Sequence, residues 1–143
     1  MICVGVDPGV NGGLAALGED GVVVSVSKMP ATERGVYEWF AALQPFGGAA
    51  RAVIEKAQPM PQQGVVSMFT YGRGYGGLLM ALTACEIPFD TVTSPVWQLA
   101  MQCRSKGDKN VTKRRAEQLF PKQKITHAIA DALLIAEYCR RRW

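Results

Sequence analysis

The chain begins with three short apolar runs joined by tight turns, and this order restricts the folds open to it. The first run, Ile2–Val6, ends at Asp7-Pro8-Gly9, where proline cannot continue a paired strand. A glycine-rich bend leads into the second run, Leu14–Leu17, and Asp20-Gly21 turns the chain into the third, Val22–Val26. An Asp-Gly pair between two apolar runs is a strong hairpin signal. The three runs therefore predict an antiparallel meander of strands.

Patterns typical of helices and strands alternate after this meander. The sequence predicts a helix over 32–43 capped by Thr32, a buried strand over 51–55 and a glycine-punctuated helix over 63–85. A strand over 89–92 follows, then a helix capped by Ser94, a basic helix that opens at Asn110 or Thr112, and a final helix over 126–138. No internal repeat or low-complexity linker interrupts this order. We therefore expect one mixed α/β domain spanning residues 1–143.

The composition excludes several classes of protein. With 143 residues, 48% of them hydrophobic and 20% charged, the chain is long and apolar enough to build one core. No apolar stretch reaches the roughly 18–20 residues of a membrane helix, and the N-terminus lacks the basic region of a secretory signal. The four cysteines form no Cys-x-x-Cys pair, which argues against a structural zinc site and a disulfide framework. We expect a protein of the reducing cytoplasm that does not bind membranes.

The positive charge is concentrated in one segment. Residues 104–124 carry eight Lys and Arg side chains against two acidic ones, a local net charge of +6, whereas residues 1–103 carry a net charge of −3. Three further arginines stand at 140–142. Such a distribution is typical of a surface that binds a polyanion through its phosphates. A solvated surface with a solubilising tail would give the same composition, and charge alone does not separate the two.

Four polar side chains are expected to converge. Asp7 and Glu55 end the first and fourth predicted strands, and Asp131 lies one turn inside the last helix with His127 four residues before it on the same face. If the two strands are neighbours and the helix crosses them, the three carboxylates meet. Carboxylates brought together raise one another's pKa unless cations neutralise them, and hard divalent ions such as Mg²⁺ prefer oxygen ligands. Two such ions can assist phosphodiester cleavage.

Each of these residues also has a purely structural interpretation. Asp7 is compatible with a turn former, Glu55 with a charge at a strand end, and His127 with a capping or surface histidine. Asp131 stands in the apolar stretch 128–134, where an unpaired buried carboxylate is costly. The joint placement of the four favours a metal site over four separate structural roles.

Three segments resemble one family. Val4-Gly5-Val6-Asp7-Pro8-Gly9, Ile54-Glu55 and Ala130-Asp131-Ala132-Leu133-Leu134 are similar to motifs of RuvC-type Holliday-junction resolvases, above all the short phage-encoded members. The resemblance covers nearly the whole chain. It implies a ribonuclease H-like fold with a mixed five-stranded sheet, its first three strands antiparallel, and helices on both faces. It further implies a homodimer, in the bacterial or infected-host cytoplasm, that cuts two strands of a four-way DNA junction symmetrically with Mg²⁺ or Mn²⁺ and leaves 5′-phosphates.

The resemblance assigns roles to individual residues. Asp7, Glu55 and Asp131 match the carboxylates that hold two metal ions. Family members commonly place Asp or His three residues before the last carboxylate; position 128 is alanine here, and His127 stands four residues before. Both spacings return to one helix face, so we expect His127 at the site as a metal ligand or as a general acid or base.

Basic residues before the last helix would grip the phosphates that flank the cut. Lys113 is expected to lie closest to the active centre, by resemblance in position. The other residues expected to contact DNA are Lys56, Met60, Arg73, Arg104, Lys106, Lys109 and Arg114. Since phosphate contacts do not read bases, specificity should come mainly from the shape of the junction.

The segment after Glu55 departs from the family pattern. Bacterial members often carry a base-stacking aromatic residue there, whereas this chain reads Lys56-Ala57-Gln58-Pro59-Met60. Met60 could act as an apolar wedge, and Phe69 or Tyr71 could stack on bases, although core packing is the simpler expectation for Phe69. The glycines of 72–77 suit either a dimer interface or a helix that lies close to the sheet.

Three alternatives stay open from the sequence. The protein could be a broader nuclease on branched DNA, such as forks and flaps, or a noncatalytic junction-binding protein. A Gly-x-Asp-x-Gly turn also occurs in actin-like and sugar-kinase ATPases, but those proteins need two lobes and a much longer chain. Nothing in the sequence indicates whether a branch-migration helicase is a further partner.

Overall fold

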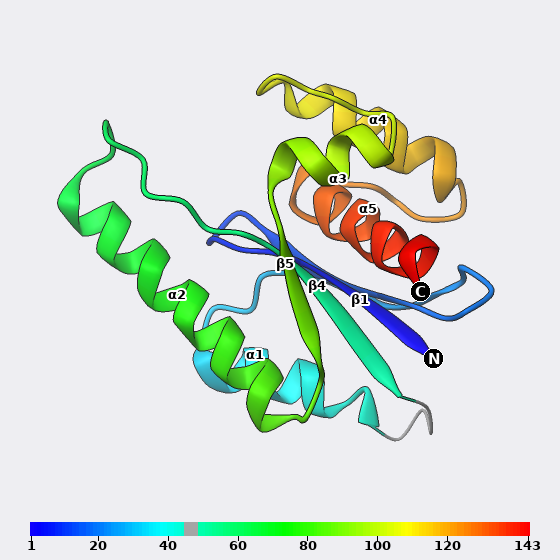
Figure 1. The fold of residues 1–143 in the computed structure, drawn as a ribbon, viewed down its shortest axis with the longest axis horizontal. Coiled ribbons are helices and arrows are strands. Elements are labelled where there is room, and N and C mark those ends of the chain that lie inside the picture. The colour runs from blue at the N-terminus through cyan, green and yellow to red at the C-terminus, as the bar shows by residue number, and fades with distance from the viewer. Residues whose placement is uncertain (45–48) are drawn as a thin grey trace.

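The computed structural model describes residues 1–44 and 49–143 and contains one five-stranded sheet with helices packed on both of its faces (Figure 1). The strands lie in the order β3-β2-β1-β4-β5. Their bounds are Ile2–Asp7 for β1, Gly13–Leu17 for β2, Val23–Lys28 for β3, Ala50–Glu55 for β4 and Phe89–Val92 for β5. The helices are α1 (Glu33–Ala41), α2 (Val65–Ala84), α3 (Ser94–Ala100), α4 (Lys109–Leu119) and α5 (His127–Arg142).

The sheet is mixed, as the sequence predicts. β1 pairs with β2, and β2 with β3, in antiparallel fashion, whereas β1–β4 and β4–β5 are parallel. Asp7 of β1 is paired with Gly13 of β2, which is in turn paired with Lys28 of β3. The pairing of Val6 with Ile54 brings the ends of β1 and β4 to the same edge of the sheet. The predicted meander is therefore confirmed, and β1 and β4 are neighbours, which is the condition for Asp7 and Glu55 to lie close together.

The helices divide between the two faces of the sheet. α1 and α2 cover one face, and α3, α4 and α5 lie on the other (Figure 1). Each face has its own hydrophobic core, because alternate residues of a strand point to opposite sides: Cys3 and Val53 pack on the α5 side, Val4 and Ile54 on the α1–α2 side. The expected placement of helices on both faces is thus correct.

Two glycines allow α5 to lie directly on the sheet. A Cβ atom at Gly5 would overlap the backbone of Ala132 and Ala136, and one at Gly13 would overlap the carbonyl oxygen of Ala128. Any larger residue at these positions would push the helix away from β1 and β2. The close approach fixes the position of the first turns of α5, where His127 and Asp131 stand.

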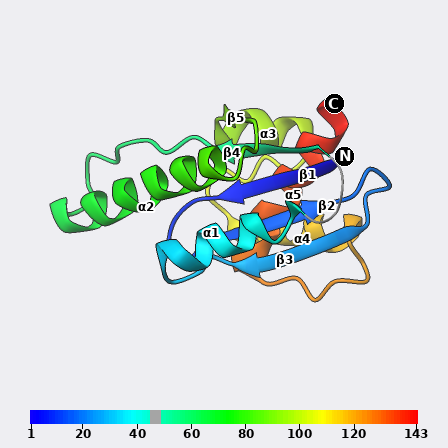
Figure 2. The ribbon, with the colours of Figure 1, turned by 90° about the horizontal axis from the view of Figure 1, so that it is seen from below.

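Helix α2 is anchored at one end only. Its buried residues, Leu78, Ala81 and Leu82, lie in its C-terminal half, and its N-terminal half extends beyond the sheet (Figure 2). The expectation that Phe69 packs in the core is wrong, because its exposed fraction is 71%. The glycines do not serve close packing on the sheet either, since a Cβ at Gly72 or Gly76 would meet no atom within 4 Å.

Helix ends agree with the predictions to within a few residues. Thr32 caps α1 as expected, its side chain accepting a hydrogen bond of 3.0 Å from the backbone N–H of Gly35. The cap of α3 is Thr93 rather than Ser94, and the cap of α4 is Asp108 rather than Asn110 or Thr112. In α4 the Asp108 carboxylate accepts from the N–H of Asn110 at 3.0 Å, an interaction that a carboxylate makes well at a helix N-terminus.

Helix α5 continues past its predicted end near residue 138. The guanidinium groups of Arg140 and Arg141 each donate to the buried carboxylate of Glu137 at 2.7 Å. These pairs, three and four residues apart on the helix, stabilise the last turn, where positive side chains also interact favourably with the helix dipole.

All four cysteines are buried free thiols. Within residues 1–44 and 49–143, none of the helices combines the length and hydropathy that a bilayer crossing requires.

Candidate functional site

Asp7 and Glu55 lie at one edge of the sheet and on the same face. Side chains alternate along each strand, so Asp7 shares the α5 side with Cys3, and Glu55 shares it with Val53. Since β1 and β4 are parallel neighbours, their last residues stand next to each other. The sequence predicted this placement from the strand ends, and the structure agrees.

Asp131 reaches the same edge from the helix above. It stands in the second turn of α5, a helix that packs on β1, β2 and β4. Its Oδ1 atom is buried and has no hydrogen-bond partner in the structure. A buried carboxylate oxygen without a partner carries a desolvation cost, which a bound cation or donor would remove.

The three carboxylates influence one another electrostatically. Burial, followed by the charges of Asp131 and Glu55, raises the pKa of Asp7 well above its usual range. Burial and the charge of Asp131 likewise raise the pKa of Glu55. Burial raises the pKa of Asp131 itself, against the hydroxyl of Thr112 and two nearby positive groups. A site that holds three such groups together favours a positive charge among them.

Glu55 is held by a tryptophan that the sequence analysis did not single out for function. The indole N–H of Trp97 donates to Glu55 Oε2 at 2.6 Å, and the Trp97 side chain is fully buried. This hydrogen bond stabilises the ionised carboxylate and so lowers the pKa of Glu55, against the effect of burial. The only hint in the sequence was a tryptophan in a short helix directly after β5.

Lys109 is the lysine whose charge affects the pKa values of the three carboxylates. Its charge lowers the pKa of Asp7, Glu55 and Asp131 alike. Lys113, which was expected to lie closest, is instead paired with Glu117 at 2.9 Å on the surface of α4. The structure thus favours Lys109 over Lys113 as the basic residue nearest the site, because Lys109 stands at the N-terminal end of α4, next to the start of α5.

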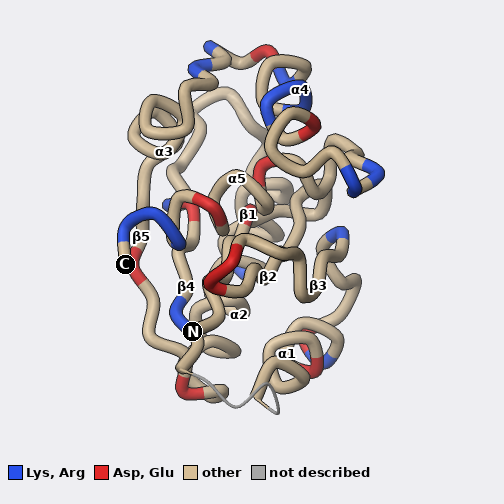
Figure 3. Tube along the Cα trace, turned by 90° about the vertical axis from the view of Figure 1, so that its right-hand side faces the viewer, with Lys and Arg blue, Asp and Glu red and all other residues tan. Residues whose placement is uncertain are grey.

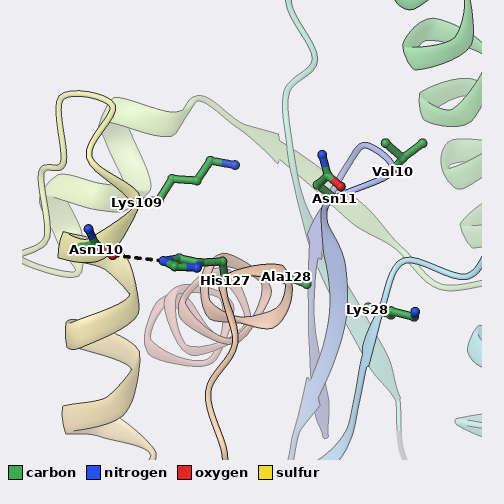
Figure 4. Close-up of a pocket in the computed structure, with 7 residues that line it drawn as sticks. All are labelled: Val10, Asn11, Lys28, Lys109, Asn110, His127 and Ala128. Carbon is green, nitrogen blue, oxygen red and sulfur yellow. Dashed lines mark hydrogen bonds between the residues drawn. The ribbon is translucent and has the colours of Figure 1, made fainter.

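His127 is the first residue of α5 and is exposed. Its Nε2 atom lies 3.1 Å from the Oδ1 atom of Asn110, the interaction drawn in Figure 4. The charge of His127 also lowers the pKa of Asp131. His127 therefore links the start of α4 to the carboxylate edge, although its ring is turned toward Asn110.

The donor set fits a hard divalent cation. Three carboxylates supply oxygen ligands, one of them with an orphaned oxygen, and repulsion by Asp131 raises the pKa values of Asp7 and Glu55. In the part of the chain that the structure describes, however, no three His, Cys, Asp or Glu side chains are close enough to hold one ion together. The carboxylates are therefore close enough for Asp131 to raise the pKa values of Asp7 and Glu55, but the three side chains do not converge on a single ion position.

Tyr71 joins the site from the opposite side. A Cβ at Gly9, which has a φ of +105°, would come within 3.3 Å of the Tyr71 ring. After burial, the charges of Glu55 and Asp7 are the main causes that raise the pKa of Tyr71. Of the two aromatic residues considered for base stacking, the structure brings Tyr71 to the carboxylates and leaves Phe69 on the outer part of α2.

The other residues predicted to contact DNA fall into two groups. Lysine and arginine gather on α4 and on the loop before it (Figure 3), where Arg104, Lys106 and Arg114 are exposed. On the other side, Lys56 and Met60 are exposed in the segment after β4, and Arg73 of α2 is paired with Glu33 of α1 at 3.0 Å.

Comparison with known proteins identifies the fold. No protein-family model matches the chain, and no curated protein matches its sequence significantly. A Thermus thermophilus RuvC structure matches with a TM-score of 0.69 at 18% sequence identity, covering 96% of this chain and 92% of that one. T. thermophilus RuvC in complex with a Holliday junction substrate matches with a TM-score of 0.68 at 17% identity, covering 96% and 91%. The predicted RuvC-type, ribonuclease H-like fold is therefore confirmed over nearly the whole chain.

Proposed function

We propose that this protein is a metal-dependent endonuclease that resolves four-way DNA junctions as a homodimer. Asp7, Glu55 and Asp131 hold two Mg²⁺ ions, for which Mn²⁺ can substitute, and His127 assists at the same site. The products are paired, symmetric nicks with 5′-phosphate ends.

One observation carries this proposal: three carboxylates from β1, β4 and α5 lie at one edge of the sheet, where burial raises the pKa of each and the charge of Asp131 raises those of Asp7 and Glu55 further. A structural role does not explain three buried acids with raised pKa values, one of them with an unpartnered buried oxygen. A catalytic role explains why the fold keeps these costly buried acids, because perturbed pKa values cluster at active sites. The similarity in fold to a RuvC structure with bound Holliday junction substrate supports a four-way junction as the substrate.

The chain's own residues prepare the site for phosphodiester hydrolysis. Mg²⁺ ions bound there would supply Lewis acidity and an activated water. The indole of Trp97 orients Glu55, and the Lys109 ammonium partly neutralises the three carboxylates. His127 stands where it can accept or donate a proton at the edge of the site.

The basic surface around α4 would bind the DNA backbone. Lys109, Arg114, Arg104 and Lys106 are exposed, and basic residues gather on α4 and the loop before it (Figure 3). Of the four, Lys109 acts directly on the carboxylates. Lysine and arginine contacts to phosphates orient a substrate without reading its sequence. Recognition would therefore rest on the shape of the junction.

The outer part of α2 is suited to a second copy of the chain. Val65, Val66 and Phe69 there have exposed fractions of 87%, 79% and 71%, and Met80, in the C-terminal half of the helix, has one of 61%. Along the same helix, Gly72 and Gly76 are open to solvent and would permit close helix contact. A symmetric dimer through this helix would present two active sites to two strands of one junction.

A cleavage assay tests the proposal. A labelled four-way junction that cannot branch-migrate is incubated with and without Mg²⁺, beside a linear duplex and a fork of matched sequence. Paired nicks in the junction alone, dependent on the metal, are expected. Equal cutting of fork and junction would replace the proposal with a broader branched-DNA nuclease, and tight binding without cutting would leave a noncatalytic junction binder.

A further inference from the structure

A cavity of about 680 Å³ opens beside the carboxylate edge. It lies between the start of α4 and α5 on one side and the β1–β2 turn and the end of β3 on the other (Figure 4). The lining residues are Val10, Asn11, Lys28, Lys109, Asn110, His127 and Ala128. They come from four separate parts of the chain, so only the folded structure creates this cavity.

Lys28 belongs to the same row of the sheet as Asp7. The pairing of Asp7 with Gly13, and of Gly13 with Lys28, puts these residues side by side across three strands. Val26 packs against the core on the α5 side, and Lys28, two residues later, shares that side. Two strand spacings separate the Cα atoms of Lys28 and Asp7, a distance of about 10 Å.

The chemistry of the cavity suits an anion. Its lining contains two lysines from opposite walls, Lys28 and Lys109, together with the side-chain amides of Asn11 and Asn110. No acidic residue is among the lining residues that the structure describes. The carboxylates lie next to the cavity but do not line it, and Lys109 is the residue that both share.

We propose that this cavity binds a backbone phosphate of the cut DNA strand, next to the phosphate that is cleaved, with Lys28 as its binding residue on β3. The inference rests on the proposed nuclease function, because the ligand is part of the same substrate. A separation of about 10 Å corresponds to no more than about three phosphates along one strand, at roughly 3.4 Å of rise each. DNA would thus be held from both sides of the active site, by β3 as well as by α4.

Replacing Lys28 by glutamine tests the assignment. Lys28 is exposed, so the substitution should leave the fold intact, which a thermal melt verifies. Binding of the four-way junction is measured by fluorescence anisotropy in EDTA over a series of salt concentrations. The slope of log Kd against log salt should fall by about 1, as expected for one lost phosphate contact. In the presence of Mg²⁺, KM should rise several-fold while kcat stays within about twofold.

Two further variants complete the experiment. Lys28→Arg retains the positive charge and should restore the wild-type slope and KM. Arg34→Gln removes one charge from an exposed residue of α1, on the other face of the sheet, and should change neither value. Unchanged slope and KM in Lys28→Gln, or an equal effect of Arg34→Gln, would overturn the cavity assignment while leaving the nuclease proposal intact. Wild-type protein that binds no junction would overturn both.

Discussion

The indole N–H of Trp97 donates a hydrogen bond of 2.6 Å to Glu55 Oε2. This bond connects the last residue of β4 to Trp97 of α3, whose side chain is fully buried. The bond fixes one of the three proposed metal ligands from a residue that itself never contacts substrate. Trp97 is therefore a positioning residue for Glu55.

Replacing Trp97 by phenylalanine should impair the site more than the fold. Because the hydrogen bond lowers the pKa of Glu55, its loss should move the acidic limb of the rate–pH profile to higher pH. The protein should lose roughly 1–3 kcal/mol of stability with the charged hydrogen bond. Junction cleavage is measured across pH beside Trp39→Phe, a control in α1, and an identical shift in both variants would refute the positioning role.

Replacing Asp7 by asparagine should abolish cleavage and leave junction binding largely intact. The change removes a charge that holds metal but touches none of the basic residues that would contact phosphate. Cleavage in Mg²⁺ and binding in EDTA are measured on the same junction. Simultaneous loss of both activities in a folded variant would contradict this division of roles.

The same substitution should stabilise the metal-free protein at neutral and alkaline pH. The pKa of Asp7 is raised in the folded state, so the folded protein binds its proton more tightly than the unfolded chain. Wild-type stability therefore falls as pH rises from about 4, the unfolded pKa, through the raised folded value. Asp7→Asn lacks this carboxylate, so its free energy of unfolding at neutral and alkaline pH should exceed that of wild type by about 0.5–2 kcal/mol.

Thermal melts in EDTA at pH 4 and pH 8 measure this difference. The variant should melt higher than wild type at pH 8, by roughly 2–4 °C for each kcal/mol, and close to wild type at pH 4. Added Mg²⁺ should raise the melting temperature of wild type but not of the variant, since a ligand stabilises only the state that binds it. A variant less stable than wild type at pH 8 would contradict the repulsion among the three acids.

Lys109 should matter more for cleavage than Lys113. Lys109→Gln removes the positive charge that lowers all three carboxyl pKa values, and its kcat should fall on the order of 100-fold. Lys113→Gln breaks a surface ion pair with Glu117, an interaction worth about 0–1 kcal/mol, and should cost little activity. The kcat values of the two variants under saturating junction provide the test, and the reverse order would restore Lys113 to the site.

Gly5 should tolerate no side chain. A Cβ there would overlap the backbone of Ala132 and Ala136, so Gly5→Ala must displace α5 and with it Asp131. We expect a loss of about 1–3 kcal/mol or more, together with loss of cleavage. Gly77→Ala in the C-terminal half of α2, where a Cβ would meet only the Glu33 side chain at 3.9 Å, is the matched control and should be neutral or stabilising by up to about 1 kcal/mol. Chemical denaturation of both variants measures the difference.

Much of this fold was predictable because its signals are local. The turn at Asp20-Gly21 and the break at Pro8 depend only on nearby backbone preferences, and they define the ends of β1 to β3. Asp7 and Glu55 were predictable because each follows an apolar run typical of a strand. Asp131 was predictable because it stands in an apolar run with helical spacing. Helix caps moved by one or a few residues, since Thr93 and Asp108 compete with neighbours that have similar capping ability.

What the sequence by itself determined is therefore the order of the elements, their approximate ends and the three acids, two at strand ends and one inside the last helix. The tertiary structure alone decided that Trp97 holds Glu55, that Lys109 takes the position expected of Lys113, and that Lys28 shares a row with Asp7. It also decided that Phe69 stays outside the core. The physical reason is that these relationships depend on how helices pack across the sheet and on strand register. Both are settled by contacts between residues far apart in the chain, which no local pattern contains.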